Sequence, residues 1–315
     1  MTTMRFGVMA PQTRAWSEVS GFVRFLDHET RFHSAFVIDH MVPLPPGQDD
    51  SGICFEAWTS LAALAATTER IRLGVMVTGV TYRNPALVAK MAATVDHISN
   101  GRLELGIGAA WHDEEHRAYG WDFPAVRERQ DRLEEAVQLI RALFEADGGH
   151  VSFSGTHYRL EQAAFVPGPV QRPRPPIIVG GGGEKRTLRT LARYGDVMNT
   201  GGTPEAMRRK IAVLEAHCRA AGRDPAEIEK TYQGPIVVSD NEALVDRVAA
   251  LVAAGGEVTA EEAKRSMPIG NAAHVRAVVE EYARIGVGRM VAITSPPWKP
   301  DIYRRLNDEV VAAFA

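Results

Sequence analysis

Short apolar runs alternate with longer amphipathic segments along the whole chain. The apolar runs predict strands at residues 4–10, 35–38, 71–78, 103–108, 176–179, 196–199, 236–239 and 290–294. Segments with apolar residues three or four positions apart predict helices between them, for example over 17–31, 55–67, 184–194 and 204–221. Strands that are apolar throughout and separated by helices are typical of a parallel sheet covered on both faces.

The number of strand–helix units, about eight, predicts an α/β fold of one closed (β/α)8 TIM barrel. A doubly wound protein of two domains fits this count less well. No change in composition marks a domain boundary, so we expect one domain over residues 1–315. Three stretches interrupt the alternation and are expected to be insertions, around 41–55, 149–170 and 240–270, the second of them a small hairpin.

Composition narrows the class of protein. With 36 Lys and Arg against 39 Asp and Glu, the net charge of −3 argues against a nucleic-acid-binding face. No apolar run approaches the roughly 18–20 residues that span a bilayer, and the first residues lack the apolar core of a secretion signal. The two cysteines, Cys54 and Cys218, exclude a disulfide framework, which makes the cytoplasm the expected location.

Residues that directly follow the strands should form the site, because active sites of such barrels lie at the carboxyl ends of the strands. Most of these residues are neutral donors and glycines, together with one acid–histidine pair, Asp39-His40. A His-x-His motif after the first strand, typical of metal-dependent barrel hydrolases, is absent, so we expect no metal site. A late-strand lysine for Schiff-base chemistry is also absent.

Four glycines, Gly180–Gly183, join an apolar strand to a helix. Bare backbone amides at such a turn can approach an oxyanion at the helix N-terminus. We place Lys185 and Arg186 in the first helical turn, where a cation is unfavourable unless an anion neutralises it. The sequence therefore favours a phosphate group here over the alternative of a tight turn with solvated charges.

His40 is the candidate for acid–base chemistry, because imidazole titrates near neutral pH and can exchange a proton with a substrate hydroxyl or carbonyl. The alternative for Asp39-His40 is a capping aspartate beside a surface histidine. Trp111 and His112 follow the fourth strand and are candidates for the substrate pocket, or else core filler and loop surface.

Several spaced motifs, in order along nearly the whole chain, resemble the luciferase-like flavin and deazaflavin oxidoreductases, and specifically the branch that uses coenzyme F420. They are Val37-Ile38-Asp39-His40, Gly74–Thr78 leading into Tyr82-Arg83-Asn84-Pro85, Asn100-Gly101-Arg102, Gly106–Trp111 with Glu115 and Gly120, and Gly180–Gly183 with Lys185–Leu188.

This resemblance implies a bulge in the third strand with a non-prolyl cis peptide against the central ring of the cofactor, at Val75–Met76 give or take one position. It implies that Asp39 contacts the polar edge of the ring, that Thr78 lies near the pyrimidine-like ring, and that His40 is the active-site base. The implied cofactor-binding set is Asp39, Val75, Met76, Thr78, Gly108, Gly180, Gly181, Gly182, Gly183, Lys185 and Arg186, with Arg189 nearby.

One departure from the family's pattern concerns the substrate. Trp111 stands where sugar-phosphate dehydrogenase relatives carry an active-site glutamate, which favours a more apolar pocket. We therefore expect an F420-dependent oxidoreductase that transfers a hydride to or from a small organic molecule. The alternatives are an FMN-dependent monooxygenase of the same fold, a non-catalytic deazaflavin carrier and a metal-dependent hydrolase. A homodimer is expected by family analogy.

Overall fold

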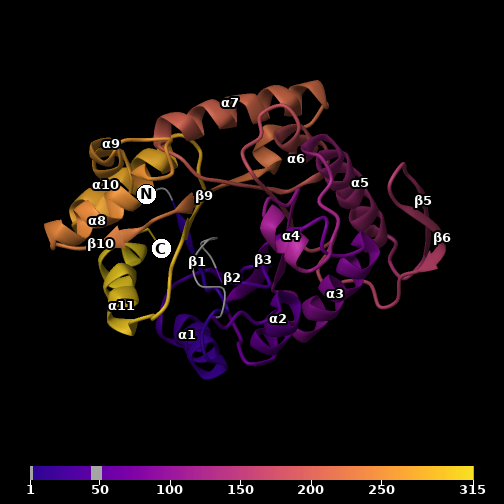
Figure 1. Ribbon diagram of the computed structural model, residues 1–315, viewed down its shortest axis with the longest axis horizontal. Helices are drawn as coiled ribbons and strands as arrows, with labels where there is room; N and C mark the ends of the chain where they lie inside the picture. The colour runs from indigo at the N-terminus through magenta and orange to yellow at the C-terminus, as the bar shows by residue number, and fades with distance from the viewer. Residues whose placement is uncertain (1–2, 44–51, 315) are drawn as a thin grey trace.

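Eight parallel strands close into a barrel in the computed structural model, which describes residues 3–43 and 52–314 (Figure 1). This confirms the predicted (β/α)8 fold. In order round the barrel the strands are β1 (Arg5–Met9), β12 (Arg289–Ala292), β9 (Glu229–Gly234), β8 (Val197–Thr200), β7 (Ile177–Gly180), β4 (Leu103–Gly108), β3 (Arg72–Gly79) and β2 (Ser34–Val37).

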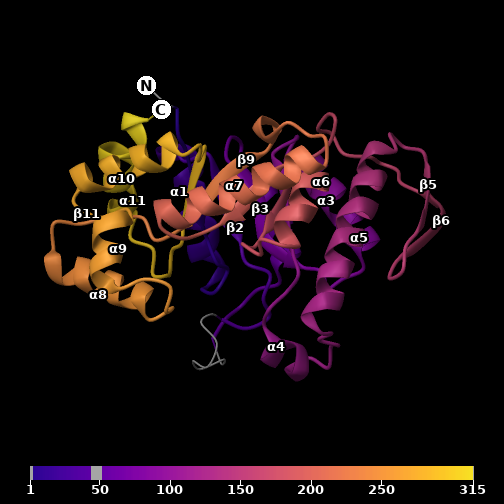
Figure 2. The same ribbon diagram turned by 90° about the horizontal axis from the view of Figure 1, so that it is seen from above.

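Helices surround this barrel (Figures 1 and 2). They are α1 (Trp16–Glu29), α2 (Ala57–Ala66), α3 (Pro85–Ile98), α4 (Asp113–Ala118), α5 (Val126–Glu145), α6 (Thr187–Tyr194), α7 (Pro204–Ala220), α8 (Glu242–Ala253), α9 (Ala260–Ser266), α10 (Ala272–Arg284) and α11 (Pro300–Glu309), with 3-10 turns at Pro225–Glu227 and Val311–Ala313. Within the described ranges, none of these helices is long and apolar enough to cross a membrane.

Two additions to the barrel lie at its outside. The antiparallel hairpin of β5 (His150–Ser154) and β6 (Arg159–Ala164) lies at one edge of the molecule beside α5 (Figures 1 and 2). On the other side, α8 and α9 accompany a two-stranded parallel sheet of β10 (Val237–Val238) and β11 (Ile269–Gly270). Most of the insertion expected around 41–55 lies outside the described residues.

The seventh barrel strand is not where the apolar run predicts it. Residues 236–239 contain β10, which pairs with β11 outside the barrel, and β9 at Glu229–Gly234 takes the seventh place. The prediction was wrong because β9 reads Glu-Lys-Thr-Tyr-Gln-Gly and has no apolar run. Its first residue, Glu229, belongs to an ionic network inside the barrel, so the usual apolar signal of a buried strand is missing.

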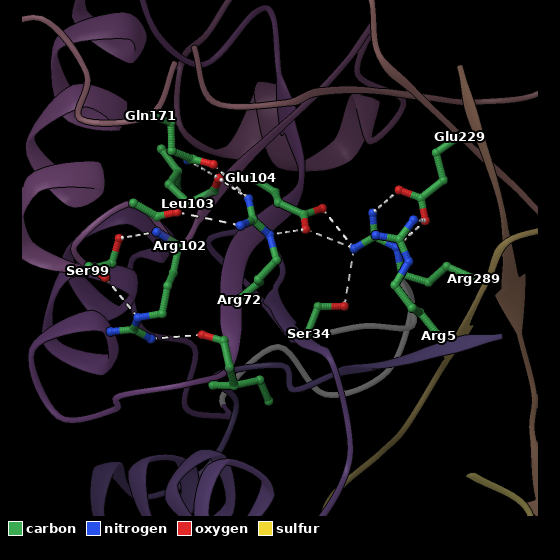
Figure 3. A network of polar contacts seen from close by, with 12 residues as sticks. Arg5, Ser34, Arg72, Ser99, Arg102, Leu103, Glu104, Gln171, Glu229 and Arg289 are labelled. Atoms are coloured by element: carbon green, nitrogen blue, oxygen red, sulfur yellow. Dashed lines mark hydrogen bonds and ion pairs between the residues drawn. The ribbon is translucent and has the colours of Figure 1, made fainter. Parts of the chain in front are cut away.

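That network fills the amino-terminal end of the barrel, where Arg289, Glu229, Arg72 and Glu104 lie at or near the starts of their strands (Figure 3). Arg289, 1% exposed, contacts Glu104 Oε2 and Glu229 Oε2, each at 2.8 Å. Arg72 Nε lies 2.7 Å from Glu104 Oε1. Burial alone raises the pKa of Glu104, but the two guanidinium groups outweigh it and hold the pKa at about 2. Glu104 is therefore a buried carboxylate at neutral pH.

We call the network of Arg72, Glu104, Glu229 and Arg289 the floor network. Between it and the carboxyl-terminal end of the strands, the barrel interior is filled by apolar side chains. A Cβ on Gly74 would overlap the backbone carbonyl oxygen of Glu104 and lie 3.1 Å from the ring of Phe36, so glycine is needed at that point of β3. Phe36 packs in one buried cluster with Met9, Ile38, Met76, Ile178, Val197 and Val291. These side chains close the barrel interior at its amino-terminal end. A site for chemistry can therefore form only at the opposite end, where the strands terminate, which we call the mouth of the barrel.

We predict that Glu104→Gln destabilises the protein by about 3 kcal/mol in urea unfolding, because it leaves buried Arg289 and half-buried Arg72 with less compensating charge. Because the pKa of Glu104 is lowered from 4.5 to about 2, the stabilising effect of this carboxylate is present above pH 4.5. The difference between wild type and variant should therefore shrink as the pH falls from 4.5 towards 2.

Glu128→Gln provides the control, since Glu128 forms a solvent-exposed pair with Arg132 one turn along the same helix. Such a pair contributes about 0.5 kcal/mol or less. Equal losses of stability in the two variants would contradict the role given to the floor network.

Candidate active site

The exit of β2 places Asp39 in a buried ionic clamp. Asp39 Oδ2 accepts a hydrogen bond from Arg83 Nη1 at 2.7 Å, and Arg83 Nη2 donates to Glu56 Oε1 at 2.6 Å. The other oxygen, Oδ1, is buried and has no hydrogen-bond partner in the part of the chain that the structure describes. Burial raises the pKa of Asp39, and the Arg83 guanidinium opposes this shift. A buried carboxyl oxygen without a partner is suited to a ligand N–H or O–H group.

His40 is oriented by Glu115, which is 2% exposed and follows β4. His40 Nδ1 lies 3.0 Å from Glu115 Oε2, which also accepts from the Tyr82 hydroxyl, and the backbone N–H of Met41 donates to Glu115 Oε1 at 2.6 Å. Burial raises the pKa of Glu115, but the hydrogen bonds from His40, Tyr82 and Met41 hold it at about 2. An ionised carboxylate accepts hydrogen bonds only, so Nδ1 carries a proton and Nε2 is the nitrogen left for proton exchange.

Trp111 and His112 lie beside His40 at the start of α4. The Trp111 ring is stacked on His112, with centroids 4.9 Å apart and 12° between the planes. The His112 ring centroid lies 5.8 Å from that of His40. Among the described residues, buried His112 Nε2 has no hydrogen-bond partner, whereas Trp111 is 55% exposed. Leaving a buried polar atom unpaired costs about 1–3 kcal/mol, which a ligand at this point would offset.

The third strand carries a bulge beside this group. Its register with β4 shifts between Val75 and Thr78, and the Met76–Val77 peptide is cis. This lies within the one-residue margin of the sequence-based position, Val75–Met76. Val75 and Met76 are buried, and Thr78 Oγ1 accepts a hydrogen bond from Trp58 Nε1 at 3.0 Å.

Two of the predicted cofactor-binding glycines make room for the bulge. A Cβ added to Gly108 or to Gly180 would lie 2.8 Å from a methyl group of Val77. Real Cβ atoms essentially never approach that closely. These glycines therefore let Val77 sit between the ends of β4 and β7.

The remaining glycines form an open elbow after β7. Gly181 has φ +114°, a conformation that favours glycine. A Cβ on Gly182 would meet Lys210 Nζ and Thr200 Oγ1, each at 2.8 Å. A cavity of about 640 Å³ opens here, lined by Gly182, Glu184, Thr200, Gly201, Gly202, Arg209, Lys210 and Glu257.

The placement of Lys185 and Arg186 in the first helical turn was wrong, because α6 begins only at Thr187. Arg186 forms an ion pair with Asp131 of α5, Arg189 forms one with Glu134, and Lys185 is exposed. The cations that line the cavity instead are Lys210 of α7 and its neighbour Arg209, which is paired with Glu184. Lys210 contacts Thr200 and Gly201. Helical side chains slant towards the N-terminus of their helix, so this lysine on the second turn reaches back over the exit of β8.

Sequence reasoning also missed the groups that hold the site together. Tyr82 and Arg83 stood in a motif carrying the resemblance, but their partners, Glu115 and Glu56, lie 33 and 27 residues away. The one available signal was that Glu115 follows the fourth strand at the spacing typical of the family.

In the described ranges, 3–43 and 52–314, no three His, Cys, Asp or Glu side chains form a potential metal site.

Comparison with known proteins bears on this geometry. The sequence pattern of the luciferase-like monooxygenase family matches residues 2–315. The chain belongs to this family. One relative is an F420-dependent hydroxymycolic acid dehydrogenase of Mycobacterium tuberculosis, which is 35% identical over 67% of this chain and 57% of the relative. Another is an F420-dependent glucose-6-phosphate dehydrogenase of Amycolatopsis mediterranei, which is 32% identical over 65% of this chain and 60% of that relative. The chain thus spans less than two thirds of the length of either relative.

Two solved structures show the same fold as this chain. An F420-dependent secondary alcohol dehydrogenase in complex with an F420–acetone adduct superposes with a TM-score of 0.82 over the whole of both chains, at 24% identity. A monooxygenase from Streptomyces bottropensis superposes with a TM-score of 0.79 at 21% identity, over 99% of this chain and all of that one. These two superpositions show that the chain shares its fold with both solved structures.

We predict that Glu115→Gln reverses the tautomer of His40. With the amide oxygen kept on the Met41 N–H, the amide nitrogen faces His40, which must then accept at Nδ1 and carry its proton on Nε2. Nitrogen-15 NMR of labelled protein distinguishes the two tautomers. Tyr82→Phe is the control, because it leaves the carboxylate and should keep the proton on Nδ1. Unchanged His40 resonances in Glu115→Gln would refute the assignment.

Proposed function

We propose that this protein is an F420-dependent oxidoreductase that transfers a hydride between the deazaflavin and a small organic alcohol or carbonyl compound. The observation that carries the proposal is the contact of His40 Nδ1 with ionised Glu115, which leaves Nε2 of His40 for proton exchange. Beside it lies His112 Nε2, which has no hydrogen-bond partner within residues 3–43 and 52–314. The relatives named as F420-dependent dehydrogenases support the choice of cofactor.

The residues at the mouth fit a deazaflavin. Asp39 offers a buried carboxyl oxygen, without a partner in the described part of the chain, for the polar edge of the ring. The β3 bulge with Val77 offers an apolar surface for one ring face. Gly182 and Gly183 offer backbone amides at the elbow for the anionic tail. When bound, F420 supplies the carbon that accepts or donates the hydride.

The chain's own part is proton transfer and orientation. In alcohol oxidation, His40 Nε2 takes the hydroxyl proton, and in carbonyl reduction it returns one to the oxygen. The Glu115 carboxylate stabilises the imidazolium formed when His40 is protonated at both nitrogens. His112 Nε2 forms a hydrogen bond with the same substrate oxygen, and exposed Trp111 contacts the apolar body of the substrate.

Further properties belong to the same proposal. We propose one barrel domain that contains the whole site, a homodimer and a cytoplasmic location. The single closed barrel supports one domain, and the resemblance to the family supports a homodimer. The cytoplasmic location is consistent with the absence of a membrane-spanning helix among the described residues.

Titration of the purified protein with F420 and with FMN, followed by visible absorbance, tests the function. We predict tight binding of F420 and F420-linked turnover of members of a panel of secondary alcohols and ketones. His40→Ala should keep the affinity for F420 but lose at least a hundredfold in kcat, because general acid–base catalysis contributes about 10²–10⁴-fold. A preference for FMN with oxygen consumption would favour the monooxygenase alternative, and undiminished turnover in His40→Ala would remove its role.

We predict that His112→Phe keeps or raises the stability of the fold, because it removes a buried nitrogen that has no partner among the described residues. Its kcat should fall at least tenfold, with F420 affinity unchanged. His112→Gln, which restores a donor, should recover part of the turnover. A His112→Phe enzyme that is less stable and equally active would show a structural role only.

A further inference from the structure

Large apolar side chains from three segments are exposed beside His40. Trp111 is 55% exposed, Ile53 49% and Tyr119 48%. Trp111 lies just before α4, Tyr119 directly follows α4, and Ile53 lies before α2. Single exposed apolar residues are ordinary on a protein surface, but several that gather from different segments mark a place where a ligand or a partner binds. We call Ile53, Trp111 and Tyr119 the rim patch.

Two members of the rim patch contact the candidate site directly. The Trp111 ring centroid lies 5.4 Å from that of His40, with 66° between the planes. Tyr119 Oη lies 3.5 Å from the carbonyl oxygen of Met41. The Tyr119 ring is stacked on that of Trp121, with centroids 5.2 Å apart, so its position is set by packing. The patch is therefore continuous with the histidine that the proposed function uses for proton transfer.

Ile53 reaches the same place through its two neighbours in the chain. Cys54 Sγ donates a hydrogen bond to the His40 carbonyl oxygen at 3.2 Å. A Cβ on Gly52 would lie 2.9 Å from Cγ of Pro43, so residue 52 packs against the segment that follows His40. Ile53 is held between these two contacts, and its side chain is exposed instead of packed in the core.

The rim patch leads out of the barrel. Figure 2 shows α4 beyond the ends of the strands, on the side of the mouth. This helix has six residues and is about 9 Å long, with Trp111 before it and Tyr119 after it. A substrate whose reacting carbon lies at His40 covers the whole patch only if its body extends outwards past Trp111. The three side chains carry no charge, so the body that they contact is apolar.

We propose that the substrate is an alcohol or carbonyl compound with an apolar chain, and that the rim patch binds this chain outside the mouth of the barrel. This inference rests on the proposed function, because it takes His40 as the group that faces the reacting oxygen. It gives Ile53 and Tyr119 a part in selecting the substrate by its length. Contacts to an unreactive chain are equally strong in the substrate complex and in the transition state, so they lower KM and leave kcat unchanged.

The experiment measures kcat and KM for the homologous series from 2-butanol to 2-nonanol with oxidised F420, and for the matching 2-alkanones with reduced F420. Full burial of one methylene group strengthens binding about fourfold, and contact with a surface on one side about twofold. We therefore expect the KM of wild type to fall at least tenfold from the shortest to the longest member, while kcat stays within threefold.

The double variant Ile53→Ser/Tyr119→Ser removes two members of the rim patch and should reduce this fall in KM to less than threefold. Ile302→Ser is the matched control, because Ile302 is 52% exposed on α11 and lies outside the patch. It should keep the wild-type dependence on chain length. A general loss of activity would affect all members of the series alike, so the dependence on length isolates binding of the chain.

A KM that does not depend on chain length, with F420-linked turnover of the whole series, would overturn the inference and leave the proposed function intact. Dimerisation that wild type shows in sedimentation and the double variant lacks would assign the patch to a second copy of the chain, which also overturns the inference. Wild type that fails to bind F420, or that binds it and turns over no member of either series, would instead refute the proposed function.

Discussion

One buried carboxylate, that of Glu115, holds the candidate site together. It accepts hydrogen bonds from His40 and the Met41 backbone after β2 and from Tyr82 after β3, and it lies itself after β4. Three consecutive strand exits are therefore tied to one charged group. Because its pKa is held at about 2, this group stays ionised throughout the neutral range and fixes which nitrogen of His40 carries the proton.

Two buried groups of charged side chains lie at opposite ends of the barrel, one around Glu104 and the other around Glu115 and Asp39. At the amino-terminal floor, the Glu104 carboxylate is paired with the guanidinium groups of Arg289 and Arg72 (Figure 3). At the mouth, Asp39 and His112 each keep a buried polar atom without a partner among the described residues. The apolar layer around Phe36 separates the two ends. The paired charges at the floor stabilise the fold, and incomplete pairing of Asp39 and His112 at the other end leaves a carboxyl oxygen and a ring nitrogen for ligands.

The alternating pattern of the sequence predicted the barrel and most of its strands, and the strand exits pointed to Asp39, His40 and His112. It failed at β9, where Glu229 faces the ionic floor and no apolar run exists. It also misjudged Arg186, whose charge is taken by Asp131, 55 residues earlier in the chain. Lys210 could not be found from the glycine motif because the fold, and not the local sequence, brings α7 over the elbow. Long-range ion pairs leave no periodic signal.

A crystal structure of the protein soaked with F420 tests the central claim most directly. The account predicts the ring against the Met76–Val77 segment with His40 Nε2 on its open side, and the anionic tail within hydrogen-bond distance of the Gly182–Gly183 backbone. A ring bound away from His40, or an anionic tail that does not contact the Gly182–Gly183 backbone, would contradict it.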